Sequence, residues 1–308
     1  MNVADDFLKG VIQKAAAKPR RIVLPEGGEE RTQLAVKAIL QEKLAEITLL
    51  GNIPKIKEVA GRVGLDLGRV RVIDPLNAPD HDEMAALYFE LRKHKGISEA
   101  AAHEQARNLL FYGTLLLKAG KVDGFVSGST HSTGDTIRPA LHIIKTKPGI
   151  SSVSSVFFMG FPDQMMVYAD CAVMEFPTAE ELAGIALASS MTARDFGIPP
   201  ITAMLSYSTK GSAKSEAVTK VVEATRIAQQ KLAELKARDK RWAEVEIDGE
   251  FQLDAAIVPK VAELKAPGSK VGGRASVLIF PDLNAGNIGY KLTQRLAGAK
   301  AIGPILQG

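Results

Sequence analysis

The chain has 308 residues, 46% of them hydrophobic, so it can bury a substantial core, and its length lies where single cores begin to divide into two. Its 39 Lys and Arg against 35 Asp and Glu give a formal net charge of +4 with no run of like charges, which favours a solvated surface or a small anionic ligand over nucleic acid. The single cysteine, Cys171, excludes an internal disulfide and a cysteine-rich metal site.

The amino-terminal residues lack the basic segment and the apolar core of a secretory signal. No apolar stretch reaches the roughly 18 residues that a membrane-spanning helix needs. We therefore expect a cytoplasmic protein without a membrane segment.

The first half of the chain alternates short apolar runs with longer stretches of helical period. We predict buried strands at residues 21–25, 46–51, 70–75 and 123–128. One of the intervening helices, over 80–96, is predicted to be capped by Asp80 and ended by Gly96. Strands that alternate with helices favour a parallel sheet covered on both faces.

The pattern changes near residues 145–152. Two strand-like runs, 152–160 and 164–174, follow each other without an intervening helix, which predicts an antiparallel pair. Long helices come next, and residues 275–298 form a further strand, turn and helix. We therefore place a domain boundary at residue 148 and predict an α/β fold of two lobes.

A turn rich in small polar residues follows the fourth predicted strand. Between Ser127 and Asp135, seven of nine residues are Ser, Thr or Gly. Backbone N–H groups at the start of the next helix, with the helix dipole and the hydroxyl groups, can form an anion site, and Gly128 and Gly134 let the backbone approach a ligand. Arg138, on the first turns of that helix, can bind an anion in bidentate fashion. An ordinary capped loop fits the pattern equally well.

A second strand-to-helix turn, residues 279–291, has a similar design. Asp282 or Asn284 can cap the helix, glycines permit close approach, and Lys291 lies about two turns further on. A plain helix cap and a solvent-facing lysine explain this pattern as well. Arg92, near the end of the helix predicted over 80–96, is a third candidate cation, with a solvated helix end as its alternative.

Several short motifs are missing from the sequence. No dinucleotide-binding or P-loop glycine pattern occurs, and the five histidines do not have the spacing of a metal site, so we predict no metal. His131 lies inside the hydroxyl-rich turn and has the strongest claim to function among the histidines, whereas His142 is more typical of packing. Cys171 lies in a strand-like run and is predicted to be a buried, inert thiol.

Four segments together carry a resemblance to a known family: residues 21–32, 123–149, 205–213 and 248–308. They resemble the short form of the phosphate acetyl/butyryltransferase family, over essentially the whole chain. The resemblance implies two α/β lobes with a cleft between them, a three-layer architecture similar to isocitrate dehydrogenase, and a homodimer. It also implies interconversion of acetyl-CoA plus phosphate with acetyl phosphate plus CoA, without a metal or a covalent enzyme intermediate.

The resemblance assigns roles to individual residues. Arg92 and Arg138 are implied as the catalytic cations that bind substrate, and CoA enters as a substrate rather than as a bound cofactor. The residues implied to contact substrate are Ser127, Gly128, Ser129, Thr130, His131, Thr133, Asn284, Asn287 and Lys291. Ser206, Ser208 and Lys210 are weaker candidates, because a plain strand-to-helix turn explains them as well.

In this family the chain continues beyond the segment GPILQG into a P-V-N-D-L-S-R-G pattern, which supplies a serine, a phosphate-binding arginine and, slightly later, an aspartate proposed as general base. This sequence ends at Gly308, so we expect the general base to lie outside it. We also expect residues 302–308 to return to the first lobe, 1–148, and the second lobe, 149–301, to dimerise.

Three alternatives remain open at this point. A phosphate butyryltransferase would differ in the size of its acyl pocket, which the sequence does not reveal. A dehydrogenase on the same type of fold would need a cluster of metal-binding carboxylates and a nicotinamide site, and the sequence has no convincing cluster of this kind. The third alternative is a catalytically impaired binder of CoA or acetyl phosphate, or a non-catalytic module like the one fused to some malic enzymes.

Overall fold

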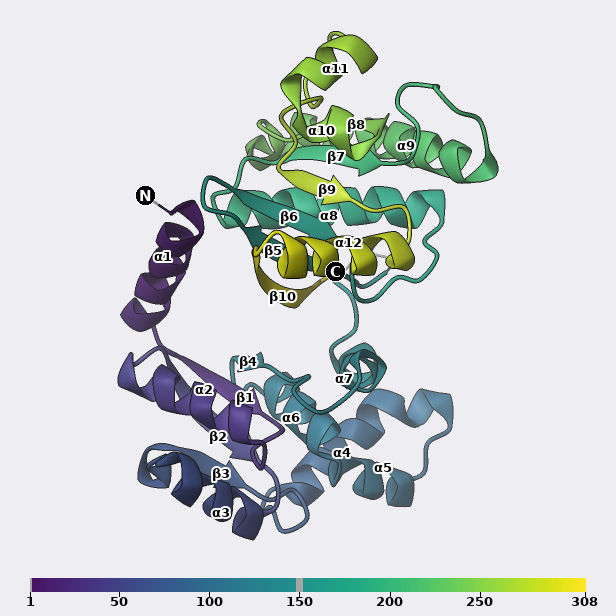
Figure 1. Ribbon diagram of the computed structural model, residues 1–308. Coiled ribbons are helices and arrows are strands. Elements are labelled where there is room, and N and C mark those ends of the chain that lie inside the picture. Colours follow the sequence, from purple (N-terminus) through teal and green to yellow (C-terminus); the bar gives the residue numbers. More distant parts are fainter. Residues whose placement is uncertain (1, 148–151) are drawn as a thin grey trace. The chain divides into compact units, whose positions relative to one another are not determined.

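The computed structural model describes residues 2–147 and 152–308, which form two compact units (Figure 1). Unit 1 comprises Met1–Leu8 and Thr146–Gly308, and unit 2 comprises Lys9–Lys145. The predicted boundary at residue 148 lies outside the described residues. Helix α1 (Val3–Ala17) begins in unit 1 and ends in unit 2.

Unit 2 is built on a four-stranded parallel sheet in the order β3-β2-β1-β4. Its strands are β1 (Arg20–Leu24), β2 (Ala45–Leu50), β3 (Arg71–Ile73) and β4 (Gly124–Phe125). Its helices after α1 are α2 (Glu30–Gln41), α3 (Ile53–Val63), α4 (His81–Arg92), α5 (Glu99–Ala106), α6 (Leu109–Lys118) and α7 (Thr133–Pro139), which continues as a π-helix over Ala140–Ile144. The predicted alternation of strands and helices is present.

Both faces of this sheet are buried, as parallel sheets require. Val23 and Leu50 pack with side chains of α4 and α6, whereas their neighbours Leu24 and Leu49 pack with side chains of α2 and α3 on the other face. All four side chains are at most 8% exposed. Burying each of these side chains contributes about 1.5–3 kcal/mol. Because both faces of the sheet are buried, the strands are continuous apolar runs rather than alternating apolar and polar residues.

The start of α4 differs from the prediction. Asp80 occupies the N-cap position, but its side chain makes no hydrogen bond to the helix backbone. Its carboxylate instead accepts hydrogen bonds from the Tyr112 hydroxyl and from Lys121 Nζ, the latter at 2.8 Å, so a long-range ion pair replaces the expected cap. Gly96 stops the helical segment as expected, with a φ of 77° that favours glycine.

Unit 1 contains a six-stranded mixed sheet in the order β10-β5-β6-β9-β7-β8. Its strands are β5 (Ser154–Gly160), β6 (Met165–Ala169), β7 (Ile201–Leu205), β8 (Glu246–Phe251), β9 (Val277–Ile279) and β10 (Lys300–Gln307). Its main helices are α8 (Ala179–Asp195), α9 (Glu216–Arg238), α10 (Leu253–Ile257), α11 (Pro259–Lys265) and α12 (Leu283–Leu296). β5 and β6 form the predicted antiparallel pair.

The segment 302–308 was predicted to return to the first lobe, and this prediction is wrong. Residues Lys300–Gln307 form β10, which pairs antiparallel with β5 at the edge of the sheet of unit 1. The register shifts between Ile302 and Ile305, where Pro304 lies, because proline has no N–H for the ladder and is tolerated at a bulge of an edge strand. The Gln307 amide anchors the end of the strand by donating to Ser154 Oγ and Ser189 Oγ.

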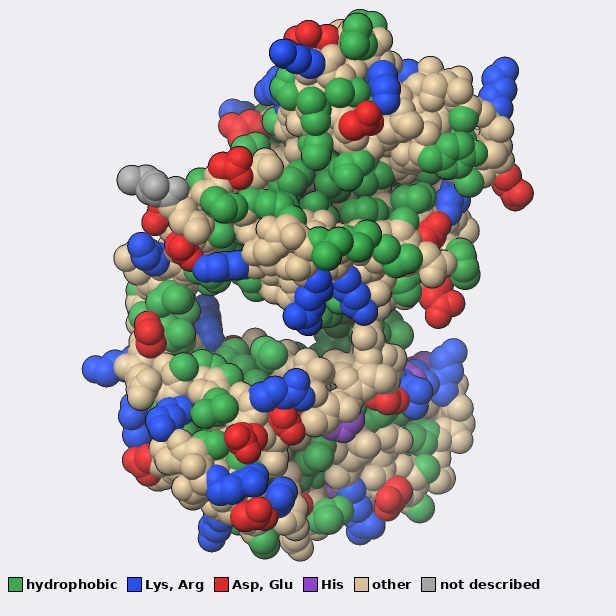
Figure 2. Space-filling view, viewed as in Figure 1, with side chains coloured by type: hydrophobic (Ala, Val, Ile, Leu, Met, Phe, Trp, Pro, Cys, Tyr) green, Lys and Arg blue, Asp and Glu red, His purple; other side chains and the backbone are tan. Residues whose placement is uncertain are grey.

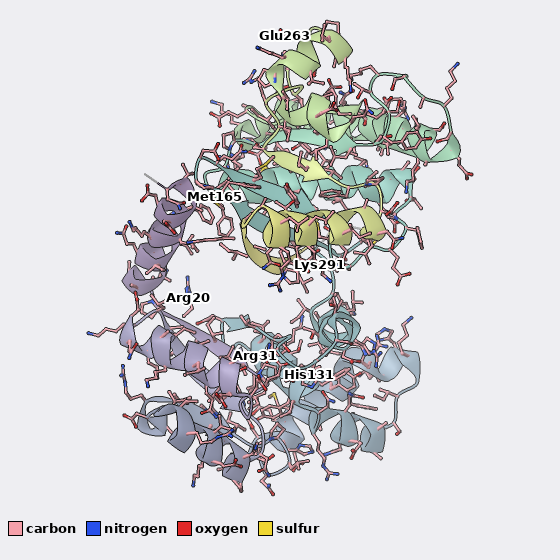
Figure 3. The ribbon with its side chains drawn as sticks, in the orientation of Figure 1. Arg20, Arg31, His131, Met165, Glu263 and Lys291 are labelled. Atoms are coloured by element: carbon pink, nitrogen blue, oxygen red, sulfur yellow. The ribbon has the colours of Figure 1, made fainter. Side chains whose placement is uncertain are left out.

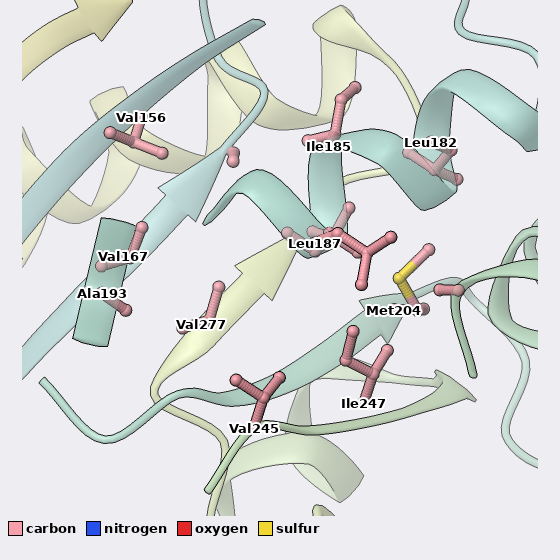
Figure 4. Close-up of a cluster of buried hydrophobic side chains, with 14 of the residues drawn as sticks. Val156, Val167, Leu182, Ile185, Leu187, Ala193, Met204, Val245, Ile247 and Val277 are labelled. Carbon is pink, nitrogen blue, oxygen red and sulfur yellow. The ribbon is translucent and has the colours of Figure 1, made fainter. Parts of the chain in front are cut away.

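The larger core of unit 1 lies between the sheet and helices α8 and α9 (Figure 4). Val167 and Val277 come from adjacent parallel strands, and Leu182 and Ile185 reach them from α8. Each of these side chains is at most 3% exposed. A second buried cluster covers the opposite face, so unit 1 also has helix, sheet and helix layers, and the predicted α/β class is confirmed.

Candidate functional site

The hydroxyl-rich turn between β4 and α7 folds around the carboxylate of Glu26, a side chain that follows β1 and is only 4% exposed. Glu26 Oε2 accepts hydrogen bonds from the backbone N–H groups of Gly128 and Ser129 at 3.0 and 2.9 Å and from Ser129 Oγ at 2.7 Å. Glu26 Oε1 accepts from the N–H groups of Thr130 and His131 at 2.8 and 3.0 Å, and from Thr130 Oγ1 at 3.1 Å.

These hydrogen bonds determine the charge of Glu26. Burial alone would raise the pKa of the carboxyl group, since it disfavours the charged form. The hydrogen bonds from Ser129, Thr130 and His131 outweigh burial and hold the pKa of Glu26 far below its ordinary value. Glu26 is therefore ionised at neutral pH, and the turn binds an anion that belongs to the chain itself.

This arrangement changes the sequence-based picture of the turn. We predicted that its backbone donors bind a substrate anion, but the N–H groups of residues 128–131 are already directed at Glu26. The sequence analysis missed Glu26 because it lies about 100 positions earlier in the chain. Its signal was the segment PEGG directly after a buried strand, since the carboxyl ends of the adjacent parallel strands β1 and β4 meet at one edge of the sheet.

The imidazole of His131 is held by the same carboxylate. His131 Nδ1 lies 2.8 Å from Glu26 Oε1, and the side chain of His131 is 32% exposed. Arg31, on α2, fixes the turn from another side by donating to Ser129 O at 2.6 Å, and it pairs with Glu29 at 2.7 Å (Figure 3). The turn is thus tied to the start of α2 at several points.

Not every group of the turn has a partner among the described residues. Ser127 Oγ is buried without a hydrogen bond there. Ser132 caps α7 by accepting from Asp135 N–H at 3.2 Å, and Thr133 is exposed. Gly128 has a φ of 112°, which a residue with a side chain rarely adopts. Ser127 and Ser129 also border a cavity of about 570 Å³, whose other lining side chains are mostly apolar.

The two predicted arginines of unit 2 act on one imidazole. The pKa of His142 is lowered by burial and then by the positive charges of Arg92 and Arg138. His142 Nδ1 lies 3.1 Å from the Tyr88 hydroxyl. The Arg138 side chain is 63% exposed and lies 3.7 Å from Asp135. Folding therefore brings both cations near one side chain, although they lie on α4 and α7.

The second turn, between β9 and α12, combines a local helix cap with hydrogen bonds to the segment after β6, where Leu283 N–H donates to Glu175 O at 3.0 Å. Asp282 caps the helix by accepting from Ala285 N–H at 2.9 Å, whereas Asn284 is exposed and is not the cap. Asn287 Nδ2 donates to Cys171 O at 3.2 Å. The Lys291 ammonium lies 5.9 Å from the ring centre of Tyr290. This turn belongs to unit 1, so its meeting with Arg92 and Arg138 in one cleft stays a prediction.

The weaker candidates have structural partners. Ser208 Oγ donates to the buried side chain of Glu250 at 2.8 Å, and Lys210 Nζ pairs with Asp248 at 2.6 Å. These contacts fit the alternative prediction that this segment is a plain strand-to-helix turn. Ser206 Oγ accepts from Ser208 N–H. Cys171 is buried, and burial raises the pKa of its thiol, as expected for an inert cysteine.

Among the described residues, three side chains could hold a metal ion: His81, Asp82 and His103, whose candidate ligand atoms lie within 4.8 Å of one another. The sequence analysis missed this group because its members lie on two helices, α4 and α5, with no motif-like spacing.

The surface matches the composition. On the face shown in Figure 2, Lys and Arg side chains lie interspersed with Asp and Glu over both units. In the described part of the chain, no helix combines the length and the apolar character that a membrane span requires.

Comparisons with known proteins agree with the sequence motifs. A family model described as Phosphate acetyl/butaryl transferase matches residues 6–308. A phosphate acetyltransferase from Thermoanaerobacterium thermosaccharolyticum is 49% identical over 309 residues, covering 98% of this chain and 90% of that protein. Two solved structures match 100% of this chain and 91% of their own, each with a TM-score of 0.88: the EutD phosphotransacetylase from Staphylococcus aureus, at 47% identity, and a phosphotransacetylase from Streptococcus pyogenes, at 43%. The resemblance found in the sequence is confirmed: the chain belongs to the phosphate acetyl/butyryltransferase family.

Proposed function

We propose that this chain is a phosphate acetyltransferase, which interconverts acetyl-CoA and phosphate with acetyl phosphate and CoA. The observation that carries this conclusion is the 49% identity to a phosphate acetyltransferase over 98% of the chain. The class of enzyme predicted from the sequence is thereby confirmed. CoA is then a substrate that leaves after each turnover.

The reaction places two demands on the protein. Acetyl phosphate and CoA both carry phosphate groups, so the site needs cations that bind them in the transition state. Removing one donor of this kind costs roughly 10²–10³-fold in rate. The thiol of CoA has a pKa near 8.5, so only a few per cent is thiolate at neutral pH, and a positioned base adds about 10²–10⁴-fold.

Arg92 and Arg138 meet the first demand in this proposal. Their shared effect on His142 supports a common location. We assign them to the phosphate groups, because a guanidinium binds phosphate through two parallel hydrogen bonds. Ser127 and Thr133 are proposed donors beside them. Asn284, Asn287 and Lys291 are proposed contacts from unit 1.

The proposal is tested by steady-state kinetics of thioester formation from CoA with acetyl phosphate or butyryl phosphate. We expect turnover with acetyl phosphate and CoA. We also expect a higher kcat/KM for acetyl phosphate than for butyryl phosphate. A higher kcat/KM for butyryl phosphate would favour the butyryltransferase alternative. CoA binding without turnover would favour the non-catalytic one.

A homodimer formed through unit 1 and a cytoplasmic location also belong to this proposal. The sequence composition and the family resemblance support them. Sedimentation equilibrium of the purified chain tests the dimer, and a single species of monomer mass would refute it.

A further inference from the structure

We propose that His81, Asp82 and His103 form a binding site for a divalent transition metal ion where the start of α4 meets α5. One candidate ligand atom from each side chain lies within 4.8 Å of the other two. The three residues are outside the set assigned above to acetyl transfer, so this site does not depend on the proposed function.

The packing of α4 against α5 explains why these side chains converge. Three alanines at most 1% exposed, Ala85 on α4 and Ala102 and Ala106 on α5, belong to one buried cluster, and such small side chains let the two helices approach closely. The connection after α4, which contains Gly96, closes one end of this helical hairpin. The start of α4 therefore lies beside the second half of α5, where His103 is located.

The distances are close to those around a bound ion. Asp82 Oδ1 lies 3.7 Å from His103 Nδ1, and the ring centres of His81 and His103 are 5.5 Å apart. A tetrahedral zinc ion with bonds of about 2.0–2.1 Å holds its ligand atoms about 3.3 Å apart. The side chains of Asp82 and His103 are 92% and 47% exposed, so both are free to rotate inward by the small distance that remains.

The ring of His81 supplies independent evidence for a ligand. Both of its nitrogens are buried, and neither has a hydrogen-bond partner among the described residues. A buried polar group without a partner is costly and rare in native proteins. A plain ring-to-ring contact between His81 and His103 would leave both nitrogens unsatisfied, whereas a metal ion satisfies one of them.

The charges at the start of α4 favour a cation. Asp80, Asp82 and Glu83 are consecutive or nearly so, and one ammonium, Lys121 Nζ, pairs with two of them, at 2.8 Å from Asp80 and 2.6 Å from Glu83. Three carboxylates therefore face a single ammonium. Their surplus negative charge offsets the positive end of the helix dipole, which by itself would disfavour a cation here.

The donor set determines the chemical class of the ion. Two imidazole nitrogens and one carboxylate oxygen suit zinc, cobalt, nickel or copper, whereas calcium and magnesium prefer oxygen ligands alone. Three protein ligands leave the fourth position of a tetrahedral ion to water. The ion joins α4 to α5 and stabilises unit 2, because the ligands come together only in the folded chain.

Titration of the untagged, metal-free chain with Co²⁺, followed by visible absorption, tests the site. We expect one equivalent to bind with the absorption of four-coordinate cobalt that has nitrogen ligands. Zn²⁺ should displace Co²⁺, since it binds the same ligands more tightly, and excess Mg²⁺ should not. Absence of this absorption, or its loss on addition of Mg²⁺, would overturn the site.

Substitutions identify the ligands. His81→Asn and His103→Asn each remove one nitrogen ligand and should abolish the spectrum, and Asp82→Asn should weaken Co²⁺ binding. His103→Asn is the most informative variant, because this half-exposed side chain can be replaced without loss of the fold, which circular dichroism checks. His94→Asn is the matched control, since His94 is exposed in the connection between α4 and α5. Identical spectra for the wild type and His103→Asn would refute the assignment.

Unfolding in urea with and without Zn²⁺ provides a second measurement. With free Zn²⁺ at about 100 times its dissociation constant, we expect the ratio of folded to unfolded chain to rise about 100-fold in the wild type and in His94→Asn. The ratio should stay unchanged in His103→Asn. An equal rise in His94→Asn and His103→Asn would mean that the ion binds elsewhere, and the proposal would fail. Neither measurement uses turnover, so both outcomes are separate from the test of the acetyltransferase.

Discussion

Two strand-to-helix turns look alike in the sequence, but the carboxylates that accept their backbone hydrogen bonds come from different parts of the chain. In unit 2, the N–H groups of residues 128–131 converge on Glu26, a carboxylate that follows a different strand. In unit 1, the start of α12 is capped from within the turn itself, by Asp282. The first turn is therefore held by a distant carboxylate. The second takes its helix cap from its own sequence, although the neighbouring Leu283 N–H donates to the Glu175 carbonyl at 3.0 Å.

This difference matters for function. A turn held by a distant carboxylate has its donors engaged, so its contribution to a ligand comes from what the carboxylate positions, here the ring of His131 and the start of the helix that carries Arg138. The self-capped turn leaves side chains at the start of α12 exposed to solvent, and Asn284 is one of them. The largest functional effects are therefore expected in unit 2 and the largest purely structural ones in unit 1.

Arg138→Ala should have the largest effect on activity. Loss of a phosphate-binding cation is expected to lower kcat/KM by about 10²–10³-fold while circular dichroism stays unchanged, because the side chain is 63% exposed and contributes little packing. Arg138→Lys should recover little of the rate, since an ammonium cannot form the planar two-bond contact. Arg107→Ala, an exposed arginine on the same unit, is the control. Wild-type kinetics in Arg138→Ala would remove this residue from the site.

Gly286→Ala should have the largest effect on stability. A Cβ at this position would lie 2.1 Å from Asp170 O, a backbone atom that cannot simply rotate away, so α12 must shift. We expect a loss of about 1–3 kcal/mol in the free energy of unfolding, measured with urea.

Gly184→Ala is the matched control for Gly286→Ala, because a Cβ there meets no atom within 4 Å on helix α8. It should be neutral or stabilise the protein by up to about 1 kcal/mol. Equal effects of the two substitutions would contradict the close approach of α12 to the Asp170 backbone.

The lowered pKa of Glu26 predicts how low pH affects the stability of unit 2. Its pKa in the folded chain is far below the value near 4.3 of an unfolded chain, so its stabilising contribution is present above about pH 4.3 and is lost as the pH falls below that value. We expect the wild type to lose stability below that pH at up to about 1.4 kcal/mol per pH unit from this group. Glu26→Gln, which does not titrate, should be less stable at neutral pH and should approach the wild type at low pH. A constant difference between the two at all pH values would refute this account.

The sequence predicted the fold further than it predicted the site. Strands β1 and β2 and helices α2 and α3 were visible because local hydrophobic period decides them, and the β5–β6 pair because two strand-like runs follow each other directly. Strand β10 was missed because Pro304 argues against a strand, and its pairing with β5 is a long-range contact that no local pattern encodes.

For the site, the sequence located the donors but not their acceptor. Ser129, Thr130 and His131 stood out by composition, whereas the choice of Glu26 among several nearby acidic residues depends on how β1 and β4 pair. The same holds for the shared effect of Arg92 and Arg138 on His142, which arises only when α4 packs against the π-helix Ala140–Ile144 that continues α7.

The smallest effects are expected from substitutions of the two helix caps, Asp282 and Ser132. Asp282→Ala removes one hydrogen bond, to Ala285 N–H, and should cost about 1 kcal/mol in the free energy of unfolding without changing the rest of the turn. Ser132→Ala removes the cap of α7, but the same turn keeps its hydrogen bonds to Glu26, so its structure should survive while the start of α7 loosens. We therefore expect Ser132→Ala to lower kcat/KM through Arg138 and Asp282→Ala to act mainly on stability. Hydrogen exchange of the amides of residues 128–131 separates the cases: protection retained in Ser132→Ala but lost in Glu26→Gln would show that the distant carboxylate, and not the local cap, holds the turn.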